Sequence, residues 1–382
     1  MAEKNTHVVV IGGGYAGVLA ANRLQRRADV TLINPRPEFV ERIRLHQLAA
    51  ANHTATLRYA DVLGPGVRLV MDAAERIDVP GRRILLASGD QVGYDYLIYA
   101  VGSTGAVPEF AYGLSELEDA QRLRDRLAEL PPGAPVVVVG AGLTGIETAA
   151  ELAGEGRTVS LVGTLGPSLA PSGRRSVAKR LHALGVDVVG AVEVCTVADG
   201  HVTLSDGRTL PSAATVWTAG FGVPGLAAVS GLSTDELGRL RTDETLTSID
   251  DPRIVAAGDA AAPSGLPLRM SCQAAMPMGA QAAQTVLARI AGAEPAVLNQ
   301  AFASQCISLG RTAGTVQFAH ADDRPRSLYL GGRTAAFVKE KICHYTVAAL
   351  RREAAEPGAY TWFKSGWRRD RLAAPSATAI AR

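Results

Sequence analysis

The chain has 382 residues, of which 47% are hydrophobic and 20% are charged, a composition typical of a globular protein with two or three domains. Its net charge of +2 does not indicate a nucleic-acid partner, because binding to a phosphate backbone requires a dense basic face. No stretch approaches the roughly 20 apolar residues of a membrane span, and the first predicted strand leaves no room for a signal peptide, so we expect a cytoplasmic protein.

The first predicted unit begins with an apolar run at residues 8–11 that is typical of a buried strand. The glycines Gly12, Gly14 and Gly17 follow it and open an Ala/Leu-rich helix. In this context the glycines permit a tight turn, the approach of a pyrophosphate to the backbone, and close packing of helix on strand. The unpaired N–H groups of the helix N-terminus favour phosphate, so a dinucleotide site is predicted here.

The same pattern recurs after a Pro-Pro-Gly breaker at residues 131–133. A strand at 136–139 leads into Gly140, Gly142 and Gly145, and a helix follows. Two such motifs, each between a strand and a helix, predict two bound dinucleotides and electron transfer between them.

The other predicted elements complete two similar units. The first unit has a strand at 30–33, a turn-rich β-meander within 64–90 and a strand within 94–103, and the second has a strand at 158–162 and a helix at 177–184. The run at 251–261 resumes a strand that ends in Gly-Asp. We therefore expect an α/β protein with two Rossmann-type domains, the second inserted into the first, and a C-terminal region of short strands and an amphipathic helix.

With these motifs in place, the chain resembles the FAD-dependent pyridine nucleotide-disulfide oxidoreductases, and within them the type II NADH:quinone oxidoreductases. The resemblance rests on GGGYAG, YDYLIYAVGS, GAGLTGIE and IVAAGDAA in this order. It implies that residues 1–108 and 240–301 bind FAD non-covalently, that 109–239 bind NADH or NADPH, and that 302–382 form an interface region. The implied reaction passes a hydride to flavin N5 and the electrons then to a quinone or similar acceptor.

The resemblance also implies roles for single residues. Asp259 falls at the ribityl or phosphate portion of FAD, Asn34 at the ribose, Ala74 near the adenine, Gly102 beside the cofactor chain and Glu147 near the nicotinamide. The predicted catalytic residues are His46, Gln273 and Glu147. The further predicted cofactor-binding residues are Gly12, Gly14, Tyr15, Ala16, Gly17, Arg36, Arg42, Ala100, Gly140, Gly142, Leu143, Thr144, Gly145, Gly163, Thr164, Gly220, Gly258, Gln273 and Ala274.

Both nucleotide sites lack the acid that usually ends the second strand of such a unit. Asn34 occupies this position in the first site, where its amide oxygen can still accept a bond from a ribose hydroxyl and Arg36 can assist. Gly163 and Thr164 occupy it in the second, so nothing there repels the 2′-phosphate of NADPH. Two nearby arginines, at 174 and 175, either bind that phosphate or are solvated, and the choice between NADH and NADPH stays open.

A third departure concerns the electron acceptor. Quinone-reducing relatives carry two glutamines at a helix start, and here Gln273 matches the first while Pro277 and Met278 replace the second, which predicts an apolar acceptor pocket. The acceptor is therefore a quinone, or a soluble small molecule or redox protein. A protein of another class, a flavin-binding redox sensor of the apoptosis-inducing-factor type, is also compatible with the motifs.

Residues 39–50 match the segment that the family folds over the flavin ring. His46, with Gln47 beside it, could donate to the reduced flavin or to an acceptor carbonyl, or it could be a surface or capping histidine. Arg42 and Arg44 either lie in the same region or form the exposed side of the helix.

The tail contains an amphipathic helical stretch followed by Tyr360, Trp362, Phe363, Trp367, Arg368 and Arg369. Such a tail either docks on the cytoplasmic face of a membrane or packs on its own FAD domain or a second subunit of a homodimer. The four cysteines form no close pair, which predicts buried thiols and neither a metal site nor a redox dithiol.

Overall fold

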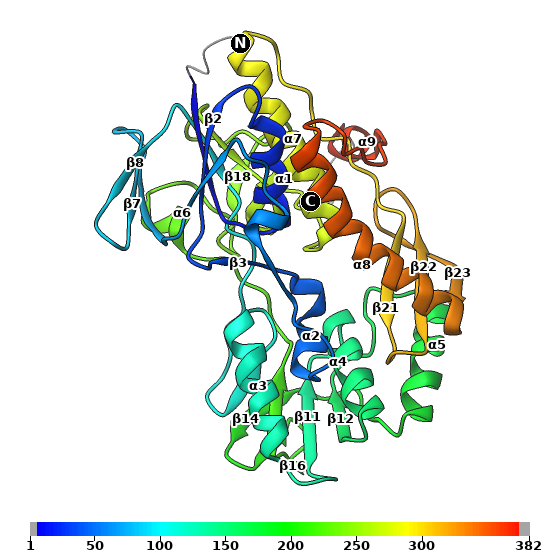
Figure 1. The fold of residues 1–382 in the computed structure, drawn as a ribbon. Coiled ribbons are helices and arrows are strands. Elements are labelled where there is room, and N and C mark those ends of the chain that lie inside the picture. Colours follow the sequence, from blue (N-terminus) through cyan, green and yellow to red (C-terminus); the bar gives the residue numbers. More distant parts are fainter. Residues whose placement is uncertain (1–5, 374–382) are drawn as a thin grey trace, which may run out of the picture.

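The computed structural model describes residues 6–373, which form two α/β units and a C-terminal region that contacts both (Figure 1). Each unit is built on a five-stranded parallel sheet. This arrangement confirms the predicted α/β class with two Rossmann-type units.

The first sheet has the strand order β19-β9-β1-β2-β5. Its strands are β1 (His7–Ile11), β2 (Asp29–Ile33), β5 (Val67–Val70), β9 (Tyr96–Tyr99) and β19 (Ile254–Ala256). Because β19 pairs with β9, the chain returns to the first sheet after it has completed the second unit. The exact domain limits given above stay a prediction.

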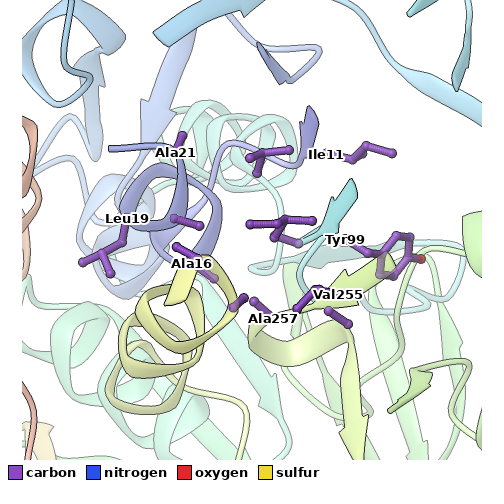
Figure 2. Close-up of a cluster of buried hydrophobic side chains, with 14 of the residues drawn as sticks. Ile11, Ala16, Leu19, Ala21, Tyr99, Val255 and Ala257 are labelled. Atoms are coloured by element: carbon purple, nitrogen blue, oxygen red, sulfur yellow. The ribbon is translucent and has the colours of Figure 1, made fainter. Parts of the chain in front are cut away.

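Helix α1 (Tyr15–Leu24) packs on β1, β2 and β9, helix α7 (Cys272–Ile290) packs on β9 and β19, and the two helices pack directly on each other. Figure 2 shows Ala16 of α1 close to Ala257, which directly follows β19, whereas Leu19 lies on the side of α1 that faces away from the strands. The α1–α7 contact is so close that a Cβ atom at Gly279 would overlap the backbone oxygen of Ala16. The small residues on both helices are therefore required by the distance between them.

The second sheet has the order β10-β17-β11-β12-β13. Its strands are β10 (Ala111–Gly113), β11 (Pro135–Val139), β12 (Thr158–Val162), β13 (Asp187–Val189) and β17 (Ala214–Trp217). The helices of this unit are α3 (Leu117–Glu129), α4 (Leu143–Gly154) and α5 (Pro171–Ala183). The valines of β11 are buried on both faces, which explains why this strand is a continuous apolar run.

Smaller elements complete the two units. The predicted meander is displaced, because β5 joins the parallel sheet and the antiparallel sheet begins only at β6. The remaining elements are β3 (Glu38–Val40), η1 (Arg42–Arg44), α2 (Leu45–Ala49), β4 (Thr56–Arg58), η2 (Tyr59–Asp61), β6 (Ala74–Asp78), β7 (Arg83–Leu86), β8 (Gln91–Gly93), β14 (Val194–Ala198), β15 (His201–Leu204), β16 (Thr209–Pro211), α6 (Leu226–Val229), β18 (Leu240–Thr242), η3 (Gly258–Ala260) and β20 (Ala261–Pro263).

The C-terminal region consists of the antiparallel strands β21 (Ser304–Ser308), β22 (Gly314–Ala319) and β23 (Pro325–Gly331), followed by α8 (Gly332–Ala355) and α9 (Trp367–Ala373). Helix α8 runs from this small sheet to α1 of the first unit (Figure 1). At the α1 end, the buried Glu353 accepts hydrogen bonds from Arg23 and from the backbone of Tyr360. Helix α5 of the second unit packs on β22 and β23, so the tail joins the two units.

Several of the aromatic and basic tail residues make internal contacts. Trp362 and Trp367 donate to Asn299 and to the Gln300 carbonyl, and Arg368 is buried against Glu244. These three side chains are therefore engaged within the protein, whereas Phe363 is exposed, and docking of the tail on a membrane stays a prediction. Among the described residues, no helix combines the length and the apolar character needed to cross a membrane.

Candidate functional site

The first glycine turn connects β1 to α1 at the carboxyl edge of the first sheet. The N–H of Gly12 donates to the carbonyl of Ile33, and a Cβ at Gly17 would overlap the carbonyl oxygen of Gly12. A Cβ at Gly14, by contrast, would meet nothing within 4 Å. The turn is therefore tight on its inner side and open on the side where the N-terminus of α1, with Tyr15 and Ala16, begins.

Asn34 is part of this turn. Its Oδ1 accepts a hydrogen bond of 3.0 Å from the N–H of Gly13, and its Nδ2 donates to the carbonyl of Arg36. The Arg36 guanidinium binds Glu116 at 2.8 Å and Glu118 at 2.7 Å. Asn34 therefore holds the glycine turn in place, and Arg36 is already paired with two carboxylates at the start of α3.

Asp259 lies in η3, directly after β19. Its Oδ2 accepts a 2.7 Å bond from the Ser103 hydroxyl, whereas its Oδ1 is buried and has no hydrogen-bond partner among the described residues. Arg42 donates to the carbonyl of Ser103, next to Gly102. A buried carboxylate oxygen requires a donor, and the hydroxyls of a ribityl chain would supply one. The open glycine turn and this orphaned oxygen together fit FAD.

The other residues predicted for FAD are distributed around this edge. The N–H of Ala100 donates to the Ile11 carbonyl of β1, and Gly258 lies beside Ala16 and Ala275. Ala74 begins β6. The Tyr15 hydroxyl is buried without a partner among the described residues, and burial raises the pKa of this phenol.

The second glycine turn repeats the geometry of the first. A Cβ at Gly145 would overlap the carbonyl oxygen of Gly140, and a Cβ at Gly142 would meet nothing within 4 Å. Helix α4 begins directly after it with Leu143 and Thr144, so its first N–H groups face the same open side. The turn therefore fits the pyrophosphate of a nicotinamide nucleotide.

The adenosine end predicted for this site begins at Gly163 and Thr164. Gly163 directly follows β12 and donates to the carbonyl of Val189. Arg174 donates to the carbonyl of Leu169 in the first turn of α5, and Arg175 is exposed. Gly220 lies beyond β17, at a positive φ of 74°. The choice between NADH and NADPH at this site therefore stays a prediction.

Glu147 belongs to a buried polar cluster between the second unit and the tail. Its Oε1 lies 3.0 Å from the Lys339 ammonium of α8 and accepts a 2.9 Å bond from the N–H of Ser308. Lys339 also donates to the carbonyl of Cys306. His46 is 3% exposed, and its Nε2 lies 3.5 Å from the Ser308 hydroxyl.

The charges of this cluster follow from its burial. Burial by itself would lower the pKa of Lys339, but the charge and hydrogen bond of Glu147, together with the nearby Cys343 and Cys306, outweigh it and raise that pKa. Burial would raise the pKa of Glu147, but the charge of Lys339 and the hydrogen bond from the Ser308 N–H help to lower it. Burial lowers the pKa of His46 to about 4. At neutral pH the cluster is therefore a Lys⁺–Glu⁻ pair beside an uncharged imidazole.

Arg44 fixes α2 against α8. It is 3% exposed, binds Glu340 at 2.8 Å and donates to the Gln47 side chain at 2.9 Å. The exposed-helix alternative is therefore wrong for Arg44. Because His46 and Gln47 are on α2, this buried contact also sets the position of His46.

Gln273 lies in the first turn of α7, where Ser271 caps the helix by accepting from the N–H of Ala274. The Gln273 side-chain oxygen accepts a 3.3 Å bond from Arg269. Met276 and Met278 are buried in the core that includes α1. A cavity lies beside Lys339, and neither methionine is among the residues that line it. The apolar acceptor pocket that the sequence predicts is therefore not formed by these residues at that cavity.

That cavity has a volume of about 390 Å³ and lies between α2, α8 and the β21–β22 turn. Its lining residues are Gln47, Ser308, Gly310, Arg311, Thr312, Arg333, Ala336, Phe337, Lys339, Glu340 and Cys343. Neither Ser308 nor Lys339 was predicted as a site residue. Lys339 could have been suspected, since it is the lysine nearest the apolar stripe of the tail helix, but no sequence pattern connects it to Glu147.

In the part of the chain that the structure describes, the cysteines and other potential ligands form no metal site. All four cysteines are free thiols, but only Cys343 is buried; Cys272 and Cys306 are half-buried, and the prediction of buried thiols is wrong for Cys195, which is exposed. Within residues 6–373, no group of three or more His, Cys, Asp or Glu side chains could hold a metal ion.

Known proteins are similar to this chain in sequence and in fold. A model of the pyridine nucleotide-disulphide oxidoreductase family matches residues 6–285. An NADH dehydrogenase-like protein of Mycobacterium tuberculosis is 36% identical over 323 residues, which cover 74% of this chain and 80% of the relative. The type II NADH:quinone oxidoreductase of that species is 28% identical, with 76% and 74% covered. The sulfide:quinone oxidoreductase of Aquifex aeolicus has the same fold, with a TM-score of 0.79 at 21% identity over 92% of this chain and 93% of that chain.

Proposed function

Because the chain belongs to the pyridine nucleotide-disulphide oxidoreductase family and is an NAD(P)H oxidoreductase, we propose that it passes electrons from NADH or NADPH through FAD to a quinone. FAD and NADH or NADPH are its cofactors. When bound, FAD supplies the redox chemistry, taking a hydride at N5 from the nicotinamide and passing on two electrons. The protein contributes binding, orientation and control of protons.

Two sets of residues would hold these cofactors. The first glycine turn, the N-terminus of α1 and Asp259 would bind FAD, with Ser103 and Arg42 fixing the Asp259 loop. The second glycine turn and the N-terminus of α4 would bind the nicotinamide nucleotide. Because Gly163 and Thr164 carry no charge to repel or bind a 2′-phosphate, we expect NADH and NADPH to bind comparably.

The observation that carries the proposal is the buried Lys339–Glu147 pair. Glu147 is on the helix that follows the second glycine turn, and Lys339 lines the cavity, so the pair lies between the donor site and a space for an acceptor. The contacts to Glu147 and Cys306 occupy two of the three N–H donors of Lys339, which leaves one for an acceptor oxygen. A quinone needs protons as well as electrons, and this ammonium can supply one and regain it from solvent.

The experiment is anaerobic reduction of the purified holoenzyme followed by reoxidation. We expect NADH and NADPH each to bleach the flavin absorbance, and a short-chain quinone to restore it at a rate that supports turnover. Flavin bleaching too slow for turnover would instead favour the redox sensor. Rapid bleaching followed by reoxidation with ferredoxin but not with quinone would favour a protein acceptor and overturn the quinone proposal.

The role of the ammonium is tested with Lys339→Met. Reoxidation by quinone should slow by about 100-fold, the typical contribution of general acid catalysis, while reduction by NADH is affected less. The matched control is Lys341→Met, because Lys341 is on the same helix but exposed and stacked on Phe337. Equal reoxidation rates in both variants would exclude a proton-donating role for Lys339.

A further inference from the structure

The cavity beside Lys339 has an unusual distribution of charge. Four of the residues that line it are charged, and two of these are neutralised within the protein: Lys339 by Glu147 at 3.0 Å, and Glu340 by the buried Arg44 at 2.8 Å. The two that remain are the arginines Arg311 and Arg333.

Neither arginine has a strong carboxylate partner. The Arg311 side chain is 49% exposed and lies 3.9 Å from Glu151, whose Oε1 is already bound by Asn52. Arg333 is exposed at the start of α8, and no carboxylate in the described part of the chain forms an ion pair with it. The cavity therefore carries net positive charge at Arg311 and Arg333.

The rest of the lining is suited to an aromatic ring. Phe337 is 63% exposed, although it is a large apolar side chain, and it lines the cavity next to Ala336. The volume of about 390 Å³ is within the range of small-molecule pockets. Guanidinium groups bind planar anions such as carboxylates, and also phosphates and sulfonates, through pairs of N–H donors.

We propose that this cavity binds a quinone that carries an anionic substituent, with the quinone oxygen toward Lys339 and the anionic group toward Arg311 and Arg333. This inference rests on the proposed function and adds the chemical class of the acceptor. In the reaction, NAD(P)H loses a hydride, which is two electrons and one proton. The quinone gains both electrons and two protons, the second proton coming from water by way of Lys339, so that quinol and NAD(P)⁺ are formed.

The test compares two quinones with the oxidised holoenzyme. The probes are 1,4-naphthoquinone-2-sulfonate, which is an anion, and 2-methyl-1,4-naphthoquinone, which is neutral, and binding is measured by calorimetry at low and at high NaCl. The variants are Arg311→Gln, Arg333→Gln and their combination. The matched control is Arg326→Gln, because Arg326 is an exposed arginine of β23 that does not line the cavity.

The double variant should bind the sulfonate about tenfold more weakly than wild type, the sum of two exposed ionic contacts, and the neutral quinone with an unchanged Kd. The control should bind both as wild type does. Raising NaCl should weaken sulfonate binding in wild type and have little effect in the double variant. Equal weakening for both probes, no change for the sulfonate, or no binding of either quinone would each overturn the inference.

Failure of this inference can be distinguished from failure of the proposed function. The calorimetric titration uses oxidised protein and needs no electron transfer, whereas the proposed function is tested by flavin reduction with NADH and reoxidation by a neutral quinone. If the neutral quinone reoxidises the flavin but the Kd of the sulfonate is unchanged in the double variant, only the preference of the cavity for anionic quinones is wrong. If an acidic redox protein loses binding in the double variant and neither quinone binds, the cavity is instead the edge of a protein docking surface.

Discussion

Replacement of His46 by glutamine should remove much of the acid sensitivity of this protein. His46 is buried, and burial lowers its pKa from 6.5 to about 4. Between these two pH values the unfolded chain binds a proton at this position and the folded chain does not. Stability therefore falls as the pH falls through this window.

The size of the effect follows from the two pKa values. At pH 5 the unfolded imidazole is almost fully protonated and the folded one is almost fully neutral, so the cost is about 2 kcal/mol, and it approaches about 3 kcal/mol at pH 4. Glutamine keeps a donor near Ser308 but does not titrate. Between pH 7.5 and pH 5, wild type should therefore lose about 2 kcal/mol more stability than His46→Gln.

The assay is urea unfolding of both proteins at a series of pH values. The matched control is His182→Gln, because His182 is an exposed histidine of α5 and its replacement should leave the pH dependence as in wild type. If the free energy of unfolding falls by the same amount in wild type and in His46→Gln between pH 7.5 and pH 5, His46 is protonated in the folded state at pH 5. The prediction of an uncharged His46 would then be wrong.

Three further predictions concern packing and buried charge. Glu147→Gln leaves Lys339 buried without a counter-charge and should cost about 3 kcal/mol in urea unfolding, whereas the double variant Glu147→Gln/Lys339→Met should regain most of this; a single-variant cost below about 1 kcal/mol would contradict the buried pair. Gly279→Ala should cost about 1–3 kcal/mol and weaken FAD retention, because its Cβ would overlap the backbone of Ala16, and the control Gly154→Ala, which has open space, should be neutral or stabilising. Glu353→Gln should destabilise the protein by about 3 kcal/mol, because it leaves the buried Arg23 without its carboxylate partner. The measurement is thermal unfolding, and a variant with the same Tm as wild type would refute this prediction.

Most of the framework could be predicted from sequence because its signals are local. The apolar runs of β1 and β11 and the glycines after them define strand, turn and helix within about 20 residues, and both turns have the close approaches at Gly17 and Gly145 that the motif requires. The return of β19 to the first sheet could be predicted for the same reason, since its Gly-Asp ending is also local.

The contacts that the sequence did not predict join distant parts of the chain. The sequence allows Arg44 to lie on an exposed helix face, and only the contact with Glu340 of α8 shows that it is buried. The ribose contact of Asn34 stays a prediction, and the sequence does not show that its oxygen also accepts from the N–H of Gly13. In both cases the side chain has several possible partners, and only the packing of α8 or of the glycine turn decides between them.

The position of Lys339 shows why the tail matters for function. Helix α8 is anchored at one end by the buried Arg23–Glu353 pair on α1, and near its other end it brings Lys339 to Glu147 of the second unit. A change in the relative position of the two units would therefore separate Lys339 from Glu147 or Arg23 from Glu353, and separating a buried ion pair is costly. The same helix begins with Arg333 and Phe337 at the cavity, so an acceptor bound there would contact the element that connects both nucleotide units. In the proposed function, a bound acceptor and the arrangement of the two units would thus be coupled through one helix.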